Sequence, residues 1–333
     1  MRRASGEPRR RIGDLPQYDW PVQSVCVIGA GVIGGLYAAH LARVADVSVL
    51  TRREEQARAL REDGLRISGK HDFTTHVRAV ADPAELPDFD LGIVATKATQ
   101  LEESAARLAG RFPGATLMTI QNGIGAEEIV RRHGEWSLIS AVTFMSGVRR
   151  SDTHVEYELD TATWMGPYAG TQTPYATVEQ VRDLLLESEL RAEAFPDLLP
   201  AQWSKLVFNA TVNTVAALTG LPHVGLFARE DAPTDLGRLV HELMDEGKRV
   251  AAAAGVQVYE DPWEMNVHAV RRGETQKSDY AHLPSMLEDV LARRPTEVDF
   301  ITGALVQQAE RLGVAAPLHW AMYRLVKGLE AGW

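Results

Sequence analysis

Cysteine is almost absent from this sequence, since Cys26 is the only one among 333 residues. A disulfide framework and a thiolate metal site are therefore excluded, no other metal site is expected, and the chain fits a reducing compartment, the cytoplasm. Cys26 lies within an apolar segment and is expected to be a small core residue. Long apolar runs are also absent, because no segment approaches the ~20 residues of a membrane-spanning helix.

Positive charge is in short supply as well. Lys and Arg number 35 against 45 Asp and Glu, which gives a net charge of −10 and argues against general binding of nucleic acid or anionic membranes. Residues 1–20 carry several arginines but no apolar segment behind them, so we expect a basic tail and no secretory signal. An anionic ligand would then need cations concentrated at one site.

A glycine-rich turn at residues 29–34, G-A-G-V-I-G, is the most informative segment that is present. It follows an apolar, β-branched segment and precedes residues 32–44, which are expected to form a helix. In this context the first glycine permits a tight turn, the second lets a pyrophosphate approach the backbone, and the third lets helix and strand pack closely. The pyrophosphate then lies at the positive end of the helix. The predicted dinucleotide contacts are Gly29, Ala30, Gly31, Val32, Ile33 and Gly34.

An acid is missing where an NAD-binding protein usually has one. The second apolar strand, residues 47–50, is followed by Thr51, Arg52 and Arg53 and not by an Asp or Glu for the ribose 2′-hydroxyl. A guanidinium can hold a 2′-phosphate by paired hydrogen bonds and can stack on adenine, so Arg52 is the first candidate and Arg53 the second. The sequence therefore favours NADP(H). The alternative is that both arginines are merely solvated at the start of the next helix.

Strand-like and helix-like segments alternate from residue 25 to about 121, which predicts a parallel sheet with helices on both faces. Residues 138–166 are expected to form antiparallel strands, and a helical period dominates from residue 197 onward. The predicted fold class is α/β, with an N-terminal Rossmann-type doubly wound sheet followed by an all-helical C-terminal domain. We expect residues 21–196 to bind NADP and residues 197–333 to bind substrate and carry catalysis.

Two of the predicted strands end in polar residues. Residues 90–95 are followed by Thr96-Lys97-Ala98, and residues 115–120 by Gln121-Asn122-Gly123. Ligands of a doubly wound sheet bind beyond the carboxyl ends of its strands, so Lys97 and Asn122 are expected to contact cofactor ribose or substrate. The alternatives are a solvated lysine and an ordinary Asn-Gly turn.

Lys205, Asn209 and Asn213 are spaced i, i+4, i+8 within residues 203–213, so on a helix they form one polar stripe. Apolar side chains cover the other faces, and the helix is expected to be buried on nearly all sides. A buried lysine must have an anionic partner, lose its proton or line a wet cleft. An ammonium with a lowered pKa suits carbonyl reduction, in which a proton reaches the oxygen as hydride reaches the carbon. The alternative is a lysine that extends to the surface.

A third polar group lies at residues 285–300. Ser285 and Asp289 share one face of a predicted helix, which Pro295 ends, and Thr296 can cap the helix that follows. By local physics alone, Glu297 is expected to complement the dipole at the start of that helix.

Together these segments resemble the ketopantoate reductases (2-dehydropantoate 2-reductases), from about residue 22 to residue 329. The first of the matching motifs is generic, whereas the ordered set of the others is specific. They are G-A-G-V-I-G-G at 29–35, T-K-A at 96–98, Q-N-G at 121–123, W-S-K-L-V-F-N at 203–209, S-M-L-E-D at 285–289 and T-E-V-D at 296–299. The resemblance implies a Rossmann-type domain joined to a helical domain, with NADPH-dependent reduction of ketopantoate to pantoate between them, a step toward pantothenate and coenzyme A.

The resemblance also implies roles for individual residues. Lys205 would be the general acid to the keto oxygen, Glu297 would hold the substrate hydroxyl and orient the lysine, and Arg52 would bind the 2′-phosphate. The other implied contacts are Ser285 to the substrate carboxylate, Asn209 and Asn213 along the substrate pocket, and Lys97 and Asn122 between cofactor and substrate.

This chain departs from the family pattern at positions that bear on the substrate. His223 and His282 stand where the family usually has asparagines, and Pro284 replaces a small polar residue. Both histidines are counted as candidate substrate-binding residues, and they change the size and hydrogen bonding of the pocket. The expected reaction type is unaffected, but the identity of the substrate is left open. The alternative is that one or both histidines lie at the rim.

Two other functions share part of this pattern. A β-hydroxyacid dehydrogenase also places a lysine and an asparagine one turn apart, but Ser285, Glu297 and the Gln-Asn-Gly turn argue against it. A non-catalytic NADP-binding sensor does not need the proton donor that Lys205 and Glu297 provide. The partner expected from the sequence is a small 2-keto acid, and a homodimer is compatible with it.

Overall fold

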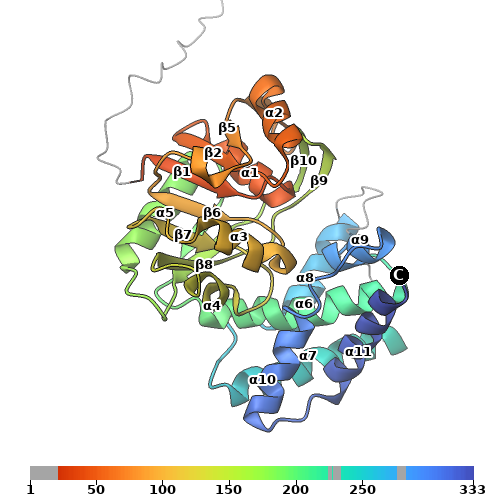
Figure 1. Ribbon diagram of the computed structural model, residues 1–333. Helices are drawn as coiled ribbons and strands as arrows, with labels where there is room; N and C mark the ends of the chain where they lie inside the picture. Colours follow the sequence, from red (N-terminus) through yellow and green to blue (C-terminus); the bar gives the residue numbers. More distant parts are fainter. Residues whose placement is uncertain (1–21, 224–226, 228–233, 276–282) are drawn as a thin grey trace, which may run out of the picture.

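The computed structural model describes residues 22–223, 227, 234–275 and 283–333 (Figure 1). The predicted basic tail and His282 lie outside the described residues. Within these ranges, a mixed α/β part is followed by a helical part, which confirms the predicted fold class.

An eight-stranded sheet in the order β12-β11-β8-β7-β6-β1-β2-β5 forms the centre of the first part. Its neighbouring strands pair in parallel, apart from β8 and β11, which are antiparallel. The strands are β1 Ser24–Ile28, β2 Asp46–Leu50, β5 Arg78–Val80, β6 Leu91–Val94, β7 Thr116–Thr119, β8 Ser137–Thr143, β11 Thr163–Pro167 and β12 Ala192–Ala194. The chain builds outward from β1 to β2 and β5 and then crosses back to β6 on the other side. The crevice beyond the ends of β1 and β6 is therefore the switch point at which such sheets bind ligands.

The expectation of antiparallel strands over residues 138–166 is wrong in part. β8 is buried along nearly its whole length and pairs in parallel with β7, as a central strand does. The next two strands leave for a second sheet, in the order β4-β3-β10-β9, where β10 alternates between buried and partly exposed residues. The strands of this sheet are β3 Leu65–Gly69, β4 Phe73–Thr75, β9 Ser146–Ser151 and β10 His154–Leu159.

Helices cover both faces of the large sheet, as predicted. Leu36 of α1 and Leu185 of α5 belong to one apolar core, and Leu101 of α3 and Val130 of α4 belong to another. Cys26 is fully buried in the second core, where burial raises the pKa of its thiol to about 12, so it is the small core residue that was expected. These helices are α1 Val32–Leu41, α2 Glu54–Asp63, α3 Leu101–Leu108, α4 Ala126–Arg131 and α5 Tyr175–Glu187.

The second part is built around the long helix α6, which contacts every other helix of this part (Figure 1). Residues on all sides of α6 are buried, which confirms the expectation for residues 203–213. The helices are α6 Leu199–Thr219, α7 Asp235–Ala253, α8 Pro262–Thr275, α9 Ser285–Leu291, α10 Thr302–Leu312 and α11 Pro317–Ala331. Across the described ranges, no helix combines the length and the apolar character needed to cross a membrane.

Candidate active site

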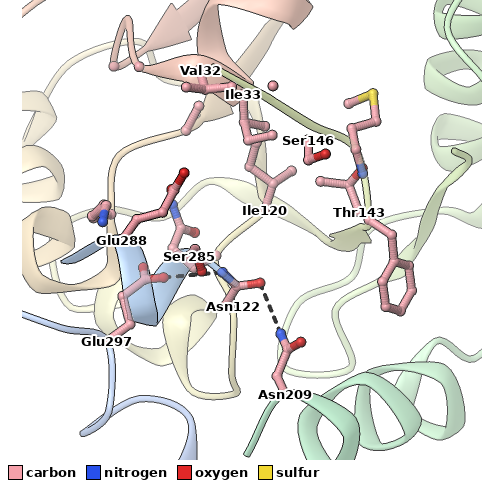
Figure 2. Close-up of a pocket in the computed structure, with 18 of the residues that line it drawn as sticks. Val32, Ile33, Ile120, Asn122, Thr143, Ser146, Asn209, Ser285, Glu288 and Glu297 are labelled. Carbon is pink, nitrogen blue, oxygen red and sulfur yellow. Dashed lines mark hydrogen bonds between the residues drawn. The ribbon is translucent and has the colours of Figure 1, made fainter. Parts of the chain in front are cut away.

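A cavity of about 1670 Å³ lies between the carboxyl edge of the large sheet and helices α6, α8 and α9. Figure 2 shows Val32 and Ile33 on one side of this cleft, Asn209 on the other, and Asn122 and Glu297 between them. Most of the predicted site residues line it: Gly29, Ala30, Gly31, Val32, Ile33, Arg52, Lys97, Asn122, Lys205, Asn209, Asn213, His223, Ser285 and Glu297. Gly34 is buried behind the turn.

The structure constrains the three glycines of the turn in different ways. Gly29 has φ +103°, a conformation that glycine adopts easily. A Cβ on Gly34 would lie 1.9 Å from the carbonyl oxygen of Gly29, whereas a Cβ on Gly31 would meet no described atom within 4 Å. Gly29 and Gly34 are thus required by the fold itself, while the space in front of Gly31 is open to the cleft.

The surroundings of this turn fit a dinucleotide. No described side chain caps the N-terminus of α1, so the N–H groups of its first turn are available to an anion. Three buried hydroxyls of the cleft have no hydrogen-bond partner among the described residues, namely Thr96 Oγ1, Ser146 Oγ and Thr161 Oγ1. Buried polar groups are normally paired, so these hydroxyls indicate a polar ligand in the cleft.

The structure distinguishes the two arginines after β2. Arg53 Nη2 lies 2.7 Å from both carboxylate oxygens of Asp152, which Arg149 also contacts. Arg52 is exposed on the cleft and forms no ion pair with another described residue. Arg53 is therefore held by Asp152, and Arg52 is better placed to meet a bound phosphate.

Lys205 is buried, with 5% of its surface exposed, so the alternative of a lysine extending to the surface is wrong. Its Nζ donates a hydrogen bond to the carbonyl oxygen of Thr143, at the end of β8, and lies 5.0 Å from the ring centre of Phe144. Burial lowers its pKa from 10.5 to about 8, and the negative charge of Glu297 opposes that shift. The ammonium can therefore release its proton near neutral pH.

Glu297 does not begin a helix, and that expectation is wrong. The hydroxyl of Thr296 accepts from the N–H of Val298 at 3.2 Å and so stabilises a turn, and α10 starts only at Thr302. The carboxylate instead accepts the backbone N–H of Ala98 at 2.8 Å, at the start of the short helix η3 (Ala98–Gln100) that leads into α3. Glu297 thus complements the N-terminus of a helix nearly 200 residues earlier in the chain.

Amide side chains connect Glu297 to α6. Asn122 Nδ2 donates to Glu297 at 3.1 Å, and Asn209 Nδ2 donates to Asn122 Oδ1 at 3.3 Å (Figure 2). Gln121 donates to the carbonyl oxygens of Val94 and Thr96 at 2.8 and 2.9 Å, and so ties the ends of β6 and β7 together. The polar groups of both parts of the chain therefore meet in one network.

Lys97 and Ser285 face the same end of the cleft. The ammonium of Lys97 contacts the carboxylate of Asp289, which also pairs with Arg294 at 3.0 Å. Ser285 is the first residue of α9, exposed to the cleft and on the same side of the helix as the buried Asp289. The pairing of Lys97 with Asp289 across the cleft was not predicted.

Thr143 and Phe144 are two further residues of the cleft that the sequence did not point to. Thr143 is the last residue of β8 and Phe144 follows it, and both line the cleft next to Lys205. The signal that could have found Thr143 is the one that found Lys97 and Asn122, namely a polar residue at the carboxyl end of a parallel strand. It was missed because β8 was expected to belong to an antiparallel group.

His223 lines the cleft beside α6, whereas His282 lies outside the described residues. The Nε2 atom of His223 lies 2.7 Å from Asn266 Oδ1, and its ring packs edge to face with that of Phe208, 5.9 Å between centres. His223 therefore adds ring surface to the cleft wall in addition to a polar group.

The sheet is doubly wound, carries the glycine turn, and shares its cleft with a buried lysine of the helical part. These features define the class of the protein as an oxidoreductase of the Rossmann type. The particular family follows from comparison with known proteins. Residues 25–170 match the family model described as "Ketopantoate reductase PanE/ApbA", and residues 197–330 match "Ketopantoate reductase PanE/ApbA C terminal". The chain belongs to the ketopantoate reductase family.

Similar proteins extend over nearly the whole chain. A 2-dehydropantoate 2-reductase of Archaeoglobus fulgidus is 30% identical over 311 residues, which are 93% of this chain and 99% of the relative. The crystal structure of a 2-dehydropantoate 2-reductase from Methylococcus capsulatus is 27% identical with a TM-score of 0.78, covering 93% of this chain and 97% of that one. The ternary structure of D-mandelate dehydrogenase with NADH and anilino(oxo)acetate, 21% identical over 93% of this chain and 99% of that one, has a TM-score of 0.82 and shows the shared fold.

Proposed function

We propose that the chain catalyses NADPH-dependent reduction of a 2-keto acid, with ketopantoate to pantoate as the first candidate. The observation that carries this proposal is the buried Lys205, whose pKa is lowered to about 8, in the same cleft as the glycine turn. Relatives named 2-dehydropantoate 2-reductase support ketopantoate as the substrate. A non-catalytic sensor would not need an ammonium with a lowered pKa at this place.

The reaction requires a hydride at the keto carbon and a proton at the keto oxygen. A bound nicotinamide supplies the hydride, and Lys205 donates the proton from Nζ as negative charge develops on the oxygen. The lysine is then neutral and takes a proton from solvent before the next cycle. Because α6 is packed on all sides, it holds the ammonium in a fixed position, which favours a proton transfer of this kind.

The substrate is oriented toward the Lys205 proton by Glu297, Asn122 and Asn209. Glu297 is fixed by the N–H of Ala98 and by Asn122, so its charge remains near Lys205 and keeps the lysine protonated at neutral pH. The amide of Asn209 is available to a substrate hydroxyl. Ser285, at the start of α9, is assigned to the substrate carboxylate.

Arg52→Ala is expected to weaken NADPH binding by about 10- to 100-fold, since a charge-assisted hydrogen bond contributes about 1.5–3 kcal/mol. NADH, which has no 2′-phosphate, should bind the variant as it binds the parent. Both dissociation constants can be measured by fluorescence titration. Arg53→Ala is the matched control, because Arg53 is already held by Asp152. Equal losses for NADPH and NADH in Arg52→Ala would place the phosphate contact elsewhere.

The pH dependence of kcat should report on Lys205. Its pKa of about 8 means that the lysine is protonated, and able to donate, below that pH and becomes neutral above it. We therefore expect kcat for reduction to be level below pH 8 and to fall about tenfold per pH unit well above it. The measurement is kcat between pH 6 and about 10 at saturating NADPH and keto acid. A profile without a descending limb in this range would contradict the assignment of Lys205 as the acid.

A further inference from the structure

The ammonium of Lys205 lies over the face of an aromatic ring. Its Nζ atom is 5.0 Å from the ring centre of Phe144, within the ~6 Å over which a cation is attracted to a ring face. The same Nζ donates a hydrogen bond to the backbone carbonyl oxygen of Thr143, the residue before Phe144. Two consecutive residues at the end of β8 therefore contact the proposed proton donor, one through its backbone and the other through its side chain.

A turn at the end of β8 presents both contacts to Lys205 together. Thr143 is the last residue of β8, and its hydroxyl accepts a hydrogen bond from the N–H of Met145 at 3.2 Å. A bond of this kind, from the backbone two residues further on, stabilises a local turn. Met145 is buried in the apolar core, so the turn is anchored on its far side as well. The backbone that carries Thr143 and Phe144 is therefore held by the protein itself.

The ring of Phe144 is fixed in turn by two other rings. It packs edge to face against Trp164 of β11, 5.6 Å between centres, and against Phe208 of α6, 6.2 Å between centres. Edge-to-face packing is a geometry that aromatic pairs prefer. Phe208 follows Lys205 by three residues, so the helix that carries the lysine also holds the ring. The ring and the ammonium are thus kept in register by the same two elements, β8 and α6.

Three influences act on the charge of Lys205. Burial lowers its pKa from 10.5 to about 8, and the negative charge of Glu297 acts in the opposite direction. Among the described residues, Glu297 is the charged side chain that acts on Lys205 from the surrounding elements. The face of an aromatic ring carries negative charge density, so Phe144 also favours the ammonium over the neutral amine, and more strongly where water is excluded.

We propose that Phe144 is a positioning residue of the reaction, whose ring holds the ammonium of Lys205 in place and keeps it charged until it donates. The catalytic part of this inference rests on the proposed function, because it uses Lys205 as the proton donor. The contacts with Thr143 and Phe144 cover two sides of the ammonium and leave the side toward the cleft for the keto oxygen. Without the ring, a larger fraction of Lys205 would be neutral at neutral pH and unable to donate.

Phe144→Leu keeps an apolar side chain beside Lys205 but removes the ring. We expect the pKa of Lys205 to fall from about 8 to about 7, the size expected from losing a cation–π contact away from water. The measurement is an NMR titration of the full chain labelled with ¹³C at lysine Cε. The chain has six lysines, and Lys205→Met identifies the resonance of Lys205. This readout does not require turnover.

Replacing Phe144 by pentafluorophenylalanine keeps a ring of similar shape but removes the negative charge density from its face. The pKa of Lys205 should fall at least as far as in Phe144→Leu. Phe195→Leu is the matched control and should leave this pKa unchanged, because Phe195 packs on Trp164 and does not line the cleft. An unchanged pKa in both Phe144 variants would overturn the inference. A fall in Phe144→Leu alone would assign the effect to packing and would also overturn it.

The pH profile of kcat separates this inference from the proposed function. In Phe144→Leu the descending limb should move down by about one pH unit, because the lysine loses its proton at a lower pH. At about pH 6, where Lys205 is protonated in both proteins, kcat should stay close to that of the parent. An equal loss of kcat at every pH would mean that the ring only supports the fold, and would contradict the inference. If the resonance titrates as expected but kcat does not follow it in either protein, the contact of ring and ammonium stands and the proposed function fails.

Discussion

Lys205→Ala should lower kcat for keto acid reduction on the order of 10²- to 10⁴-fold, the range expected when a general acid is lost. The variant removes the ammonium that gives its proton to the keto oxygen and stabilises the charge that develops there. Binding of NADPH should change little, because the proposed contacts to its pyrophosphate and 2′-phosphate come from the glycine turn and Arg52 and not from Lys205. The measurement is kcat at saturating substrate, together with a titration of NADPH.

Two further variants distinguish the loss of the proton donor from the loss of a buried side chain. Lys205→Met fills the buried space without a charge and should lose as much activity as Lys205→Ala, if proton donation is what matters. Asn213→Ala, two turns along the same face of α6, removes a polar cleft residue that cannot act as a general acid and should affect KM more than kcat. A near-normal kcat in Lys205→Met would contradict the assignment.

Lys205 was predictable because the information that marks it is local. Its spacing with Asn209 and Asn213 in an otherwise apolar helix indicated a buried cation, and the structure places it at 5% exposure. The glycine turn was predictable for the same reason, since strand, turn and helix follow one another in the sequence. Periodicity and local geometry were sufficient for both.

Glu297 shows where local information ends. Its partners are Ala98 and Asn122, which are 199 and 175 residues away in the chain, so no window of sequence contains the interaction. The residues around Glu297 predicted that it begins a helix, and this prediction was wrong, because α10 begins at Thr302. Only the resemblance to a family indicated that this carboxylate belongs to the site. Only the fold shows that it accepts a hydrogen bond from the first N–H group of η3.

β8 shows a different limit. A strand buried on both faces and a strand of an antiparallel hairpin can have similar composition, and what separates them is the identity of their neighbours in the sheet. Because β8 was grouped with β9 and β10, its carboxyl end was not placed at the cleft. Thr143 and Phe144, which contact Lys205, were missed as a consequence.

Gly34→Ala is expected to have the second large effect. The new Cβ would lie 1.9 Å from the carbonyl oxygen of Gly29, a backbone atom, so α1 must move away from β1 to accommodate it. Overpacking of this kind costs about 1–3 kcal/mol or more, and it also displaces the N–H groups that would receive the pyrophosphate. We expect a lower melting temperature and an increase in the dissociation constant for NADPH on the order of 100-fold.

Gly31→Ala separates the fold from the ligand at the same turn. Gly31 has φ −82°, which alanine adopts without strain, and no described atom lies within 4 Å of the added Cβ. The melting temperature should therefore match that of the parent, while the methyl group occupies the space through which a pyrophosphate approaches the backbone. The expected result is a loss of NADPH affinity of about 10- to 100-fold with no loss of stability. If Gly31→Ala binds NADPH as the parent does, the pyrophosphate does not lie on this turn and does not occupy the open space next to Gly31.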